Sequence, residues 1–251
     1  MKPLKVRGLV ELLGLASFTP EYLVKPHLLI KGGSMLLFGM PETYKSWLAI
    51  DLAFALAMGG RWLGYETDKC KVLVVQAEQS EEVYASTRIL EYVRAHGIMP
   101  GEYEGMVDFV NDAELRMDTY SGMQMLDAVI EESKPQVVVF DCMYQLITNE
   151  SEPRSMGGYL ENMSKLHGIG LSTVHIHHTR KRDREGGQDM GMEESSGMSA
   201  LTRWADTVGR LYANNSDEII SLEWQKQKNA KRRIKDAVTI QVAGLHFTVI
   251  K

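Results

Sequence analysis

The sequence predicts an α/β fold: a doubly wound, mostly parallel sheet flanked by helices and extended by an antiparallel β-hairpin at its C-terminal end. Three observations predict it. Four short runs are almost continuously apolar, which is typical of strands buried on both faces. Helical patterns alternate with these runs, which favours parallel strands joined by crossover helices. After residue 205 the chain shows strand patterns alone.

The expected elements follow one another along the chain. The core strands are predicted at Met35–Phe38, Val72–Val75, Val137–Phe140 and Leu171–Ile176. The helices between them are predicted at Ser46–Met58, Glu81–His96, Ser121–Ser133 and Ser155–Leu166. The strands of the tail are predicted at Asp206–Leu211, Glu218–Trp224, Ala237–Val242 and His246–Ile250. No repeat or linker divides the chain, so its 251 residues, 44% of them apolar, are expected to form one domain.

Composition limits the classes of function. The chain has 33 acidic and 28 basic side chains, a balance that argues against a generally basic nucleic-acid coat but allows a local basic groove. Its only cysteines, Cys70 and Cys142, lie in hydrophobic stretches and are expected to be buried thiols of a reducing compartment. The longest apolar helix, Trp47–Met58, carries Asp51 and is too short to span a bilayer. We therefore expect a soluble cytoplasmic protein with no membrane partner.

The first strand is followed by a candidate phosphate-binding loop. A strand, a loop from Gly39 and an apolar helix form the layout in which backbone N–H groups cradle phosphates at a helix N-terminus. Lys45 would reach the β- and γ-phosphates, and the Ser46 hydroxyl would ligate Mg²⁺. Tyr44 replaces the usual glycine, which demands a loop conformation that tolerates a Cβ atom. The residues predicted to contact the nucleotide are Gly39, Met40, Pro41, Glu42, Thr43, Tyr44, Lys45, Ser46 and Trp47.

Two carboxylates follow buried strands. Asp141 ends the third core strand, where an aspartate can hold the magnesium shell. Glu78 comes just after the second core strand, where a carboxylate can orient and deprotonate an attacking water. Each residue alone is compatible with an ordinary turn. Because ligands bind outside the carboxyl ends of strands in open α/β sheets, both are expected to meet the loop there.

Three histidines end the fourth core strand. Strand geometry sends His175 and His177 to one face and His178 to the other, and no spaced partner completes a metal site. His175 and His177 are expected to be structural. His178 is predicted to be a γ-phosphate sensor or a hydrogen-bonding partner.

Residues 225–235 are basic, whereas residues 78–132 are acidic. This asymmetry predicts a head-to-tail contact between subunits in which Lys226 or Lys228 reaches a neighbour's nucleotide. A solvated basic hairpin and a patch for nucleic-acid phosphates remain alternatives. Two polar stretches, Thr148–Gly158 and Arg180–Ser199, are expected to be functional loops.

Five segments, in order and spacing, resemble the RecA-like NTPase superfamily, in the branch of RepA-type hexameric replicative helicases. They are GMPETYKSWLAIDLA, VLVVQAEQS, VVVFDCMYQL, VHIHHTRK and SSGMSALTRWADTVGRL. The resemblance implies that Lys45 and Ser46 are the phosphate-loop pair, Asp141 the magnesium-shell aspartate, Glu78 the catalytic glutamate and His178 the γ-phosphate sensor. It also implies that Lys226 and Lys228 form the trans-acting basic pair.

The resemblance also implies a single RecA-like ATPase domain over residues 1–251, with residues 1–30 packing on it or on a neighbouring subunit. Such proteins assemble as a hexameric ring or a helical filament, with ATP and Mg²⁺ at each subunit interface. The two polar loops match those that touch single-stranded DNA. The residues implied for DNA binding are Arg180, Lys181, Arg182 and Arg184.

Three hypotheses follow. The first is an oligomeric ATPase motor on single-stranded DNA, a replicative helicase of a phage, plasmid or mobile element, with primase or other replication proteins as partners. The second is a recombination or annealing ATPase that forms filaments. The presence of lysine at both positions of the basic pair, Lys226 and Lys228, favours this hypothesis. The third is a nucleotide-gated regulatory scaffold, against which the retention of Glu78 argues.

Overall fold

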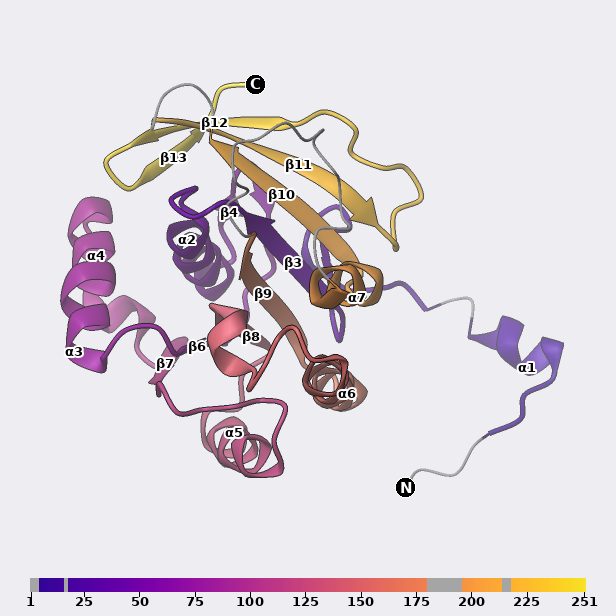
Figure 1. The fold of residues 1–251 in the computed structure, drawn as a ribbon. Coiled ribbons are helices and arrows are strands. Elements are labelled where there is room, and N and C mark those ends of the chain that lie inside the picture. Colours follow the sequence, from indigo (N-terminus) through magenta and orange to yellow (C-terminus); the bar gives the residue numbers. More distant parts are fainter. Residues whose placement is uncertain (1–4, 16–17, 180–195, 214–217) are drawn as a thin grey trace, which may run out of the picture.

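The computed structural model describes residues 5–15, 18–179, 196–213 and 218–251. Its centre is a nine-stranded sheet with the strand order β13-β12-β11-β10-β3-β9-β8-β6-β7 (Figure 1). The strands from β10 to β7 in this order run parallel, and the last three of the chain add antiparallel at one edge. This arrangement confirms the predicted mostly parallel sheet with antiparallel C-terminal strands.

The strand bounds agree closely with the predicted runs. The parallel strands are β3 (Ser34–Gly39), β6 (Val72–Gln76), β7 (Val107–Asn111), β8 (Val137–Asp141), β9 (Ser172–His178) and β10 (Thr207–Ala213). The antiparallel strands are β11 (Ile219–Gln227), β12 (Val238–Ala243) and β13 (His246–Val249). Two short pairs lie outside this sheet, namely β1 (Tyr22–Val24) with β2 (Leu29–Ile30) and β4 (Arg61–Trp62) with β5 (Tyr65–Glu66).

Helices cover both faces of the sheet. The helical elements are α1 (Leu9–Gly14), α2 (Lys45–Met58), α3 (Glu81–Tyr84), the π-helical turn η1 (Ala85–Ile89), α4 (Leu90–His96), η2 (Pro100–Tyr103), α5 (Tyr120–Ser133), η3 (Met143–Leu146), α6 (Pro153–Gly168) and α7 (Ser196–Trp204). Alternate strand residues divide the core, so Leu37 packs with α2 and Leu36 packs with α5, α6 and α7. This alternation explains why the core strands are apolar on both faces.

Four elements differ from the sequence prediction. The edge strand β7 was not predicted, because its residues are only partly buried and its sequence mixes polar with apolar side chains. Helix α7 was also missed. The predicted helix Glu81–His96 is interrupted by the π-helical turn η1. Helix α6 begins at Pro153, so the polar loop predicted at Thr148–Gly158 is shorter than expected. Proline is favoured in the first turn of a helix because its missing N–H has no partner there anyway.

The N-terminal segment divides into two parts. Residues of β1 and β2 are anchored in the core, where Val24, Leu28 and Leu29 are fully buried. Helix α1, in contrast, buries none of its residues and extends away from the sheet (Figure 1). None of the helices in the described part of the chain is long and apolar enough to cross a membrane.

The partly buried carboxylate of Asp51, which lies on α2, affects the stability of the protein. The Tyr92 hydroxyl donates to Asp51 Oδ1 at 2.7 Å, yet burial raises the pKa of Asp51 above its ordinary value of 3.8. The folded protein therefore holds this proton more tightly than the unfolded chain does, so the ionised carboxylate lowers the free energy of unfolding as pH rises above 3.8.

We expect Asp51→Asn to raise the melting temperature at pH 7, because the amide keeps an acceptor for Tyr92 without a buried charge. The gain should shrink toward pH 3, where Asp51 is protonated in both states. Thermal unfolding at both pH values tests this, with the exposed Asp127→Asn as the matched control. A variant that is less stable than the wild type at pH 7 would show that the charge of Asp51 is stabilising.

Candidate functional site

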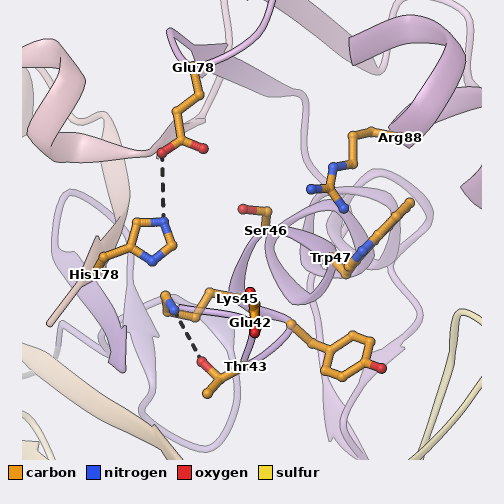
Figure 2. A pocket seen from close by; sticks show the side chains of 9 residues that line it. Glu42, Thr43, Lys45, Ser46, Trp47, Glu78, Arg88 and His178 are labelled. Carbon is orange, nitrogen blue, oxygen red and sulfur yellow. Dashed lines mark hydrogen bonds and ion pairs between the residues drawn. The ribbon is translucent and has the colours of Figure 1, made fainter. Parts of the chain in front are cut away.

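A pocket of about 440 Å³ lies at the carboxyl ends of the central parallel strands (Figure 2). The loop after β3, the segment after β6, the turn η1 and the end of β9 supply its walls. It is lined by Glu42, Thr43, Tyr44, Lys45, Ser46, Trp47, Glu78, Arg88 and His178. The predicted loop, glutamate and third histidine therefore meet in one place.

The loop between β3 and α2 keeps a left-handed turn although Tyr44 replaces glycine. Tyr44 has a φ of 59° and Glu42 a φ of 65°. A left-handed residue with a Cβ atom costs about 1–2 kcal/mol. The Tyr44 ring packs edge-on against Phe247 of β13, with ring centroids 6.2 Å apart, and this contact helps to hold the conformation. The loop therefore holds Tyr44 in a left-handed conformation that glycine adopts more readily.

Lys45 lies at the start of α2 and is 2% exposed. Its Nζ donates to the Met40 carbonyl and, at 3.1 Å, to Thr43 Oγ1, so the side chain folds back over the loop. Burial lowers the pKa of Lys45 to about 8. The buried Lys45 ammonium bonds only neutral oxygen atoms of the loop. An anionic ligand would give it a partner of opposite charge.

Ser46 and Asp141 form the second part of the site. The Ser46 hydroxyl, in the first turn of α2, donates to Asp141 Oδ1 at the end of β8 over 3.0 Å. Burial, and secondarily the charge of Glu78, raise the pKa of Asp141 to about 6. A buried carboxylate beside a hydroxyl is an oxygen donor set that fits Mg²⁺, which takes one or two such ligands and keeps several waters.

Glu78 faces His178 across the pocket, with 3.7 Å between Glu78 Oε1 and His178 Nε2 (Figure 2). The interaction with His178 holds the pKa of Glu78 below its ordinary value, so the carboxylate is ionised and able to accept a proton. Among the described residues, His178 Nδ1 is buried without a hydrogen-bond partner. A buried nitrogen of this kind beside a pocket is available to hydrogen-bond a ligand.

The other two histidines of β9 have the contacts of structural residues. His175 is fully buried and bonds the Tyr159 hydroxyl at 2.7 Å and Thr173 Oγ1 at 2.8 Å. Burial lowers its pKa to about 3, so it stays neutral. His177 lies 3.9 Å from Glu150. Neither residue lines the pocket, which agrees with the division of faces predicted from the strand.

Lys226 and Lys228 lie near the amino ends of the parallel strands, whereas the loop follows the carboxyl end of β3. Gln227 between them pairs with Thr207, which in turn pairs with Met35 at the start of β3. Lys226 Nζ donates to the carbonyls of Thr202, at 3.0 Å, and Arg203, and Lys228 Nζ lies 3.1 Å from Asp206 Oδ1. These lysines cannot serve the pocket of their own subunit. The four residues predicted to bind DNA, Arg180, Lys181, Arg182 and Arg184, lie outside the described residues.

Arg88 is a pocket residue that the sequence analysis missed. It lies on η1, and its guanidinium carbon is 4.7 Å from the centre of the Trp47 ring (Figure 2). The cation–π contact holds the guanidinium at the pocket wall. π-Helical turns of this kind are frequent at functional sites. The only sequence signal is an arginine two turns into the helix that follows Glu78, which periodicity alone does not distinguish from a solvated side chain.

The left-handed loop, the buried lysine and the Ser46–Asp141 pair, at the carboxyl edge of a mostly parallel sheet, define a RecA-like P-loop NTPase. A protein-family model described as an AAA domain matches residues 3–184. The chain belongs to this AAA-domain family. The matched region contains the loop, Glu78, Asp141 and His178 and ends before Lys226 and Lys228.

Solved structures share the fold at low sequence identity. The flagellar accessory protein FlaH from Methanocaldococcus jannaschii has a TM-score of 0.61 and 11% identity, over 87% of this chain and 89% of FlaH. A KaiC-like protein from Pyrococcus horikoshii has a TM-score of 0.63 and 13% identity, over 91% of this chain and 94% of that protein. No curated protein sequence is matched significantly. These comparisons do not single out the RepA-type helicase branch.

We expect Arg88→Ala to weaken nucleotide binding about tenfold or more, because a charge-assisted hydrogen bond to phosphate is worth about 1.5–3 kcal/mol. Titration with a fluorescent ATP analogue measures the change. Arg94→Ala, on the exposed side of α4, is the matched control and should bind normally. If both variants bind the ATP analogue as tightly as the wild type does, Arg88 does not contact the nucleotide and only packs on Trp47.

Proposed function

We propose that this protein is a Mg²⁺-dependent ATPase that works as an oligomer on single-stranded DNA, as a replicative helicase of a phage, plasmid or mobile element. The observation that carries the hydrolytic part is the Glu78–His178 pair, 3.7 Å apart, in the same pocket as Lys45 and Ser46. An ionised carboxylate next to a phosphate-binding loop is the group that hydrolysis needs and that mere nucleotide binding does not.

Each side chain has a role in this proposal. Lys45 binds the β- and γ-phosphates, and Arg88 adds a second positive charge from the opposite wall. Mg²⁺, held by Ser46 and Asp141, would neutralise the charge that develops on the phosphate oxygens. Glu78 orients a water and takes its proton, while His178 bridges Glu78 and the γ-phosphate.

The position of the basic pair supports assembly in this proposal. Lys226 and Lys228 lie near the amino ends of the parallel strands, away from the loop, so the pocket that they reach would belong to a neighbouring copy. A ring or filament with head-to-tail contacts would place them there. In this proposal the protein acts in the cytoplasm, with a primase or other replication proteins as partners.

A second candidate is a recombination or annealing ATPase that forms filaments on DNA. Lysine rather than arginine at both Lys226 and Lys228 is the observation that favours it. Directional strand displacement would identify the helicase, whereas DNA pairing without unwinding would identify the recombination enzyme.

The proposed function is tested by steady-state ATP hydrolysis with Mg²⁺, with and without single-stranded DNA, over a range of protein concentrations. We expect turnover to rise with both, because the site is completed at an interface and coupled to DNA. The Lys45→Ala variant controls for contaminating ATPases. If DNA does not change turnover, the proposal of a DNA motor is wrong and a nucleotide-gated regulatory scaffold is favoured. If no ATP is hydrolysed at any protein concentration, the proposal of an ATPase is wrong.

A further inference from the structure

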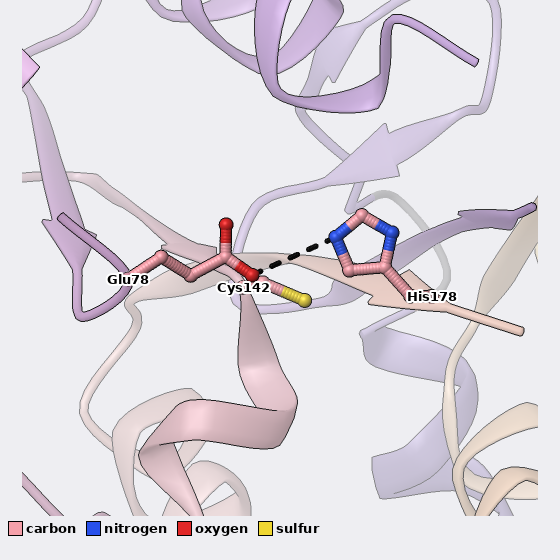
Figure 3. A group of neighbouring side chains, drawn as sticks. All are labelled: Glu78, Cys142 and His178. Carbon is pink, nitrogen blue, oxygen red and sulfur yellow. Dashed lines mark ion pairs between the residues drawn. The ribbon is translucent and has the colours of Figure 1, made fainter. Parts of the chain in front are cut away.

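Three side chains of different chemistry converge beside the pocket: Glu78, Cys142 and His178, here called the thiol–imidazole–carboxylate cluster (Figure 3). They follow or end β6, β8 and β9, which are neighbours in the sheet. Their ligand atoms all lie within 4.8 Å of one another. The parallel topology therefore brings together a carboxylate, a thiol and an imidazole that lie far apart in the sequence.

The distance between Glu78 and His178 is close to that between ligands of a tetrahedral zinc site, and Cys142 Sγ lies within 4.8 Å of both. Zinc–ligand distances near 2.0–2.3 Å place neighbouring ligand atoms about 3.3–3.6 Å apart. Glu78 Oε1 and His178 Nε2 are already 3.7 Å apart, and their side chains are 30% and 26% exposed, so they can adjust. Cys142 is fully buried and provides a fixed donor. Three protein ligands leave a fourth position open, as in catalytic zinc sites.

The cluster is distinct in chemistry from the oxygen donors of Ser46 and Asp141. Thiolate and imidazole select zinc over magnesium, whereas hydroxyl and carboxylate suit magnesium. The Cys142 thiol donates only a long bond, 3.4 Å, to the Ile176 carbonyl, and no step of the proposed hydrolysis uses it. The pocket supplies a path by which an ion can enter, because both Glu78 and His178 line it.

We propose that Glu78, Cys142 and His178 bind a zinc ion or a similarly soft divalent cation, and that the bound ion switches off hydrolysis. On binding, the Cys142 thiol releases its proton to solvent and the sulfur becomes a ligand. Glu78 then coordinates the ion and no longer accepts a proton from water. The ion removes the contact between His178 and the γ-phosphate, but ATP still binds through Lys45 and through Mg²⁺ at Ser46 and Asp141, which the ion does not use. The inhibitory part rests on the proposed function, whereas the metal binding does not.

Cobalt(II) is the probe for the binding part, because a thiolate ligand gives it a charge-transfer absorption in the near ultraviolet. We expect the full-length wild type to show this absorption and Cys142→Ser to lose it. Cys70→Ser is the matched control, since Cys70 is the only other cysteine, is buried and lies outside the cluster. Zinc competition against cobalt should show affinity more than about tenfold weaker in Cys142→Ser.

The inhibition part is measured on ATP hydrolysis with Mg²⁺ and added zinc. Zinc should stop hydrolysis by the wild type and by Cys70→Ser but leave their ATP binding, and it should spare Cys142→Ser. Equal inhibition of Cys142→Ser would overturn the proposal, because the ion would then act at Ser46 and Asp141. An absent cobalt absorption in the wild type, or one that persists in Cys142→Ser, would overturn it as well.

Two further outcomes separate the proposals. A cobalt absorption in a protein without any ATPase activity would support the metal site while the proposed function fails. If Cys142→Ser does not fold, as judged by circular dichroism, His178→Asn replaces it and should also weaken cobalt binding more than about tenfold. Unchanged cobalt binding in His178→Asn would overturn the site.

Discussion

Glu78→Gln is expected to bind ATP like the wild type and to hydrolyse it about 10²–10⁴ times more slowly. The amide keeps the size of the side chain and an acceptor for His178, but it cannot take a proton from water. The interaction that lowers the pKa of Glu78 keeps the wild-type carboxylate ionised at neutral pH, so the loss should not depend on pH near 7. Single-turnover hydrolysis and analogue titration separate the chemical step from binding.

The matched control for Glu78→Gln is Glu81→Gln, three residues away on the exposed first turn of α3. This variant should hydrolyse ATP normally. A normal rate for Glu78→Gln would exclude Glu78 as the base. A variant that also fails to bind ATP would indicate that Glu78 shapes the pocket rather than the chemistry.

Lys228→Ala is expected to lower turnover of the assembled protein by about 10³–10⁵, the effect of removing a trans-acting charge from a phosphoryl-transfer site. The side chain is 63% exposed and, among the described residues, forms an ion pair with Asp206 at 3.1 Å, so folding of the isolated subunit should be unaffected. Thermal unfolding checks the fold and steady-state hydrolysis measures the loss. Lys235→Ala, an exposed member of the same basic run, is the control.

Mixing tests whether Lys228 acts across an interface. In an equal mixture of Lys228→Ala and Glu78→Gln, about one quarter of head-to-tail interfaces combine an intact Glu78 with a neighbour's intact Lys228. We therefore expect two inactive proteins to regain measurable turnover on mixing. If both variants assemble normally but the mixture does not hydrolyse ATP, Lys228 acts within its own subunit or has no part in catalysis.

The site was predictable from the sequence to the extent that it follows local rules. Gly39 and Lys45 belong to one continuous strand–loop–helix segment, and Glu78 and Asp141 each follow an apolar run. The carboxyl ends of parallel strands meet at one edge, so a one-dimensional pattern already implied their convergence. The His178 assignment has the same origin, because alternation along a strand separates its face from that of His175.

Other parts depend on contacts between distant segments. Arg88 enters the pocket because η1 turns it onto Trp47, and Cys142 approaches His178 only because β8 pairs with β9. Strand β7 is recognisable through its partner β6, since its own residues do not follow a clear apolar pattern. Tyr44 keeps a glycine-like turn with the help of Phe247 from the far end of the chain.

Hydrophobic periodicity and the chemistry of short segments were sufficient to predict the parallel sheet, the loop between the first strand and its helix, and the carboxylates at the carboxyl ends of the strands. These features depend on backbone geometry that repeats within a few residues. The tertiary structure was needed to place Lys226 and Lys228 near the amino ends of the parallel strands, away from the loop. It was also needed to bring the thiol–imidazole–carboxylate cluster together. These positions depend on which strands are neighbours in the sheet and on the directions in which they run. The side-chain pattern of a single strand carries no information about either.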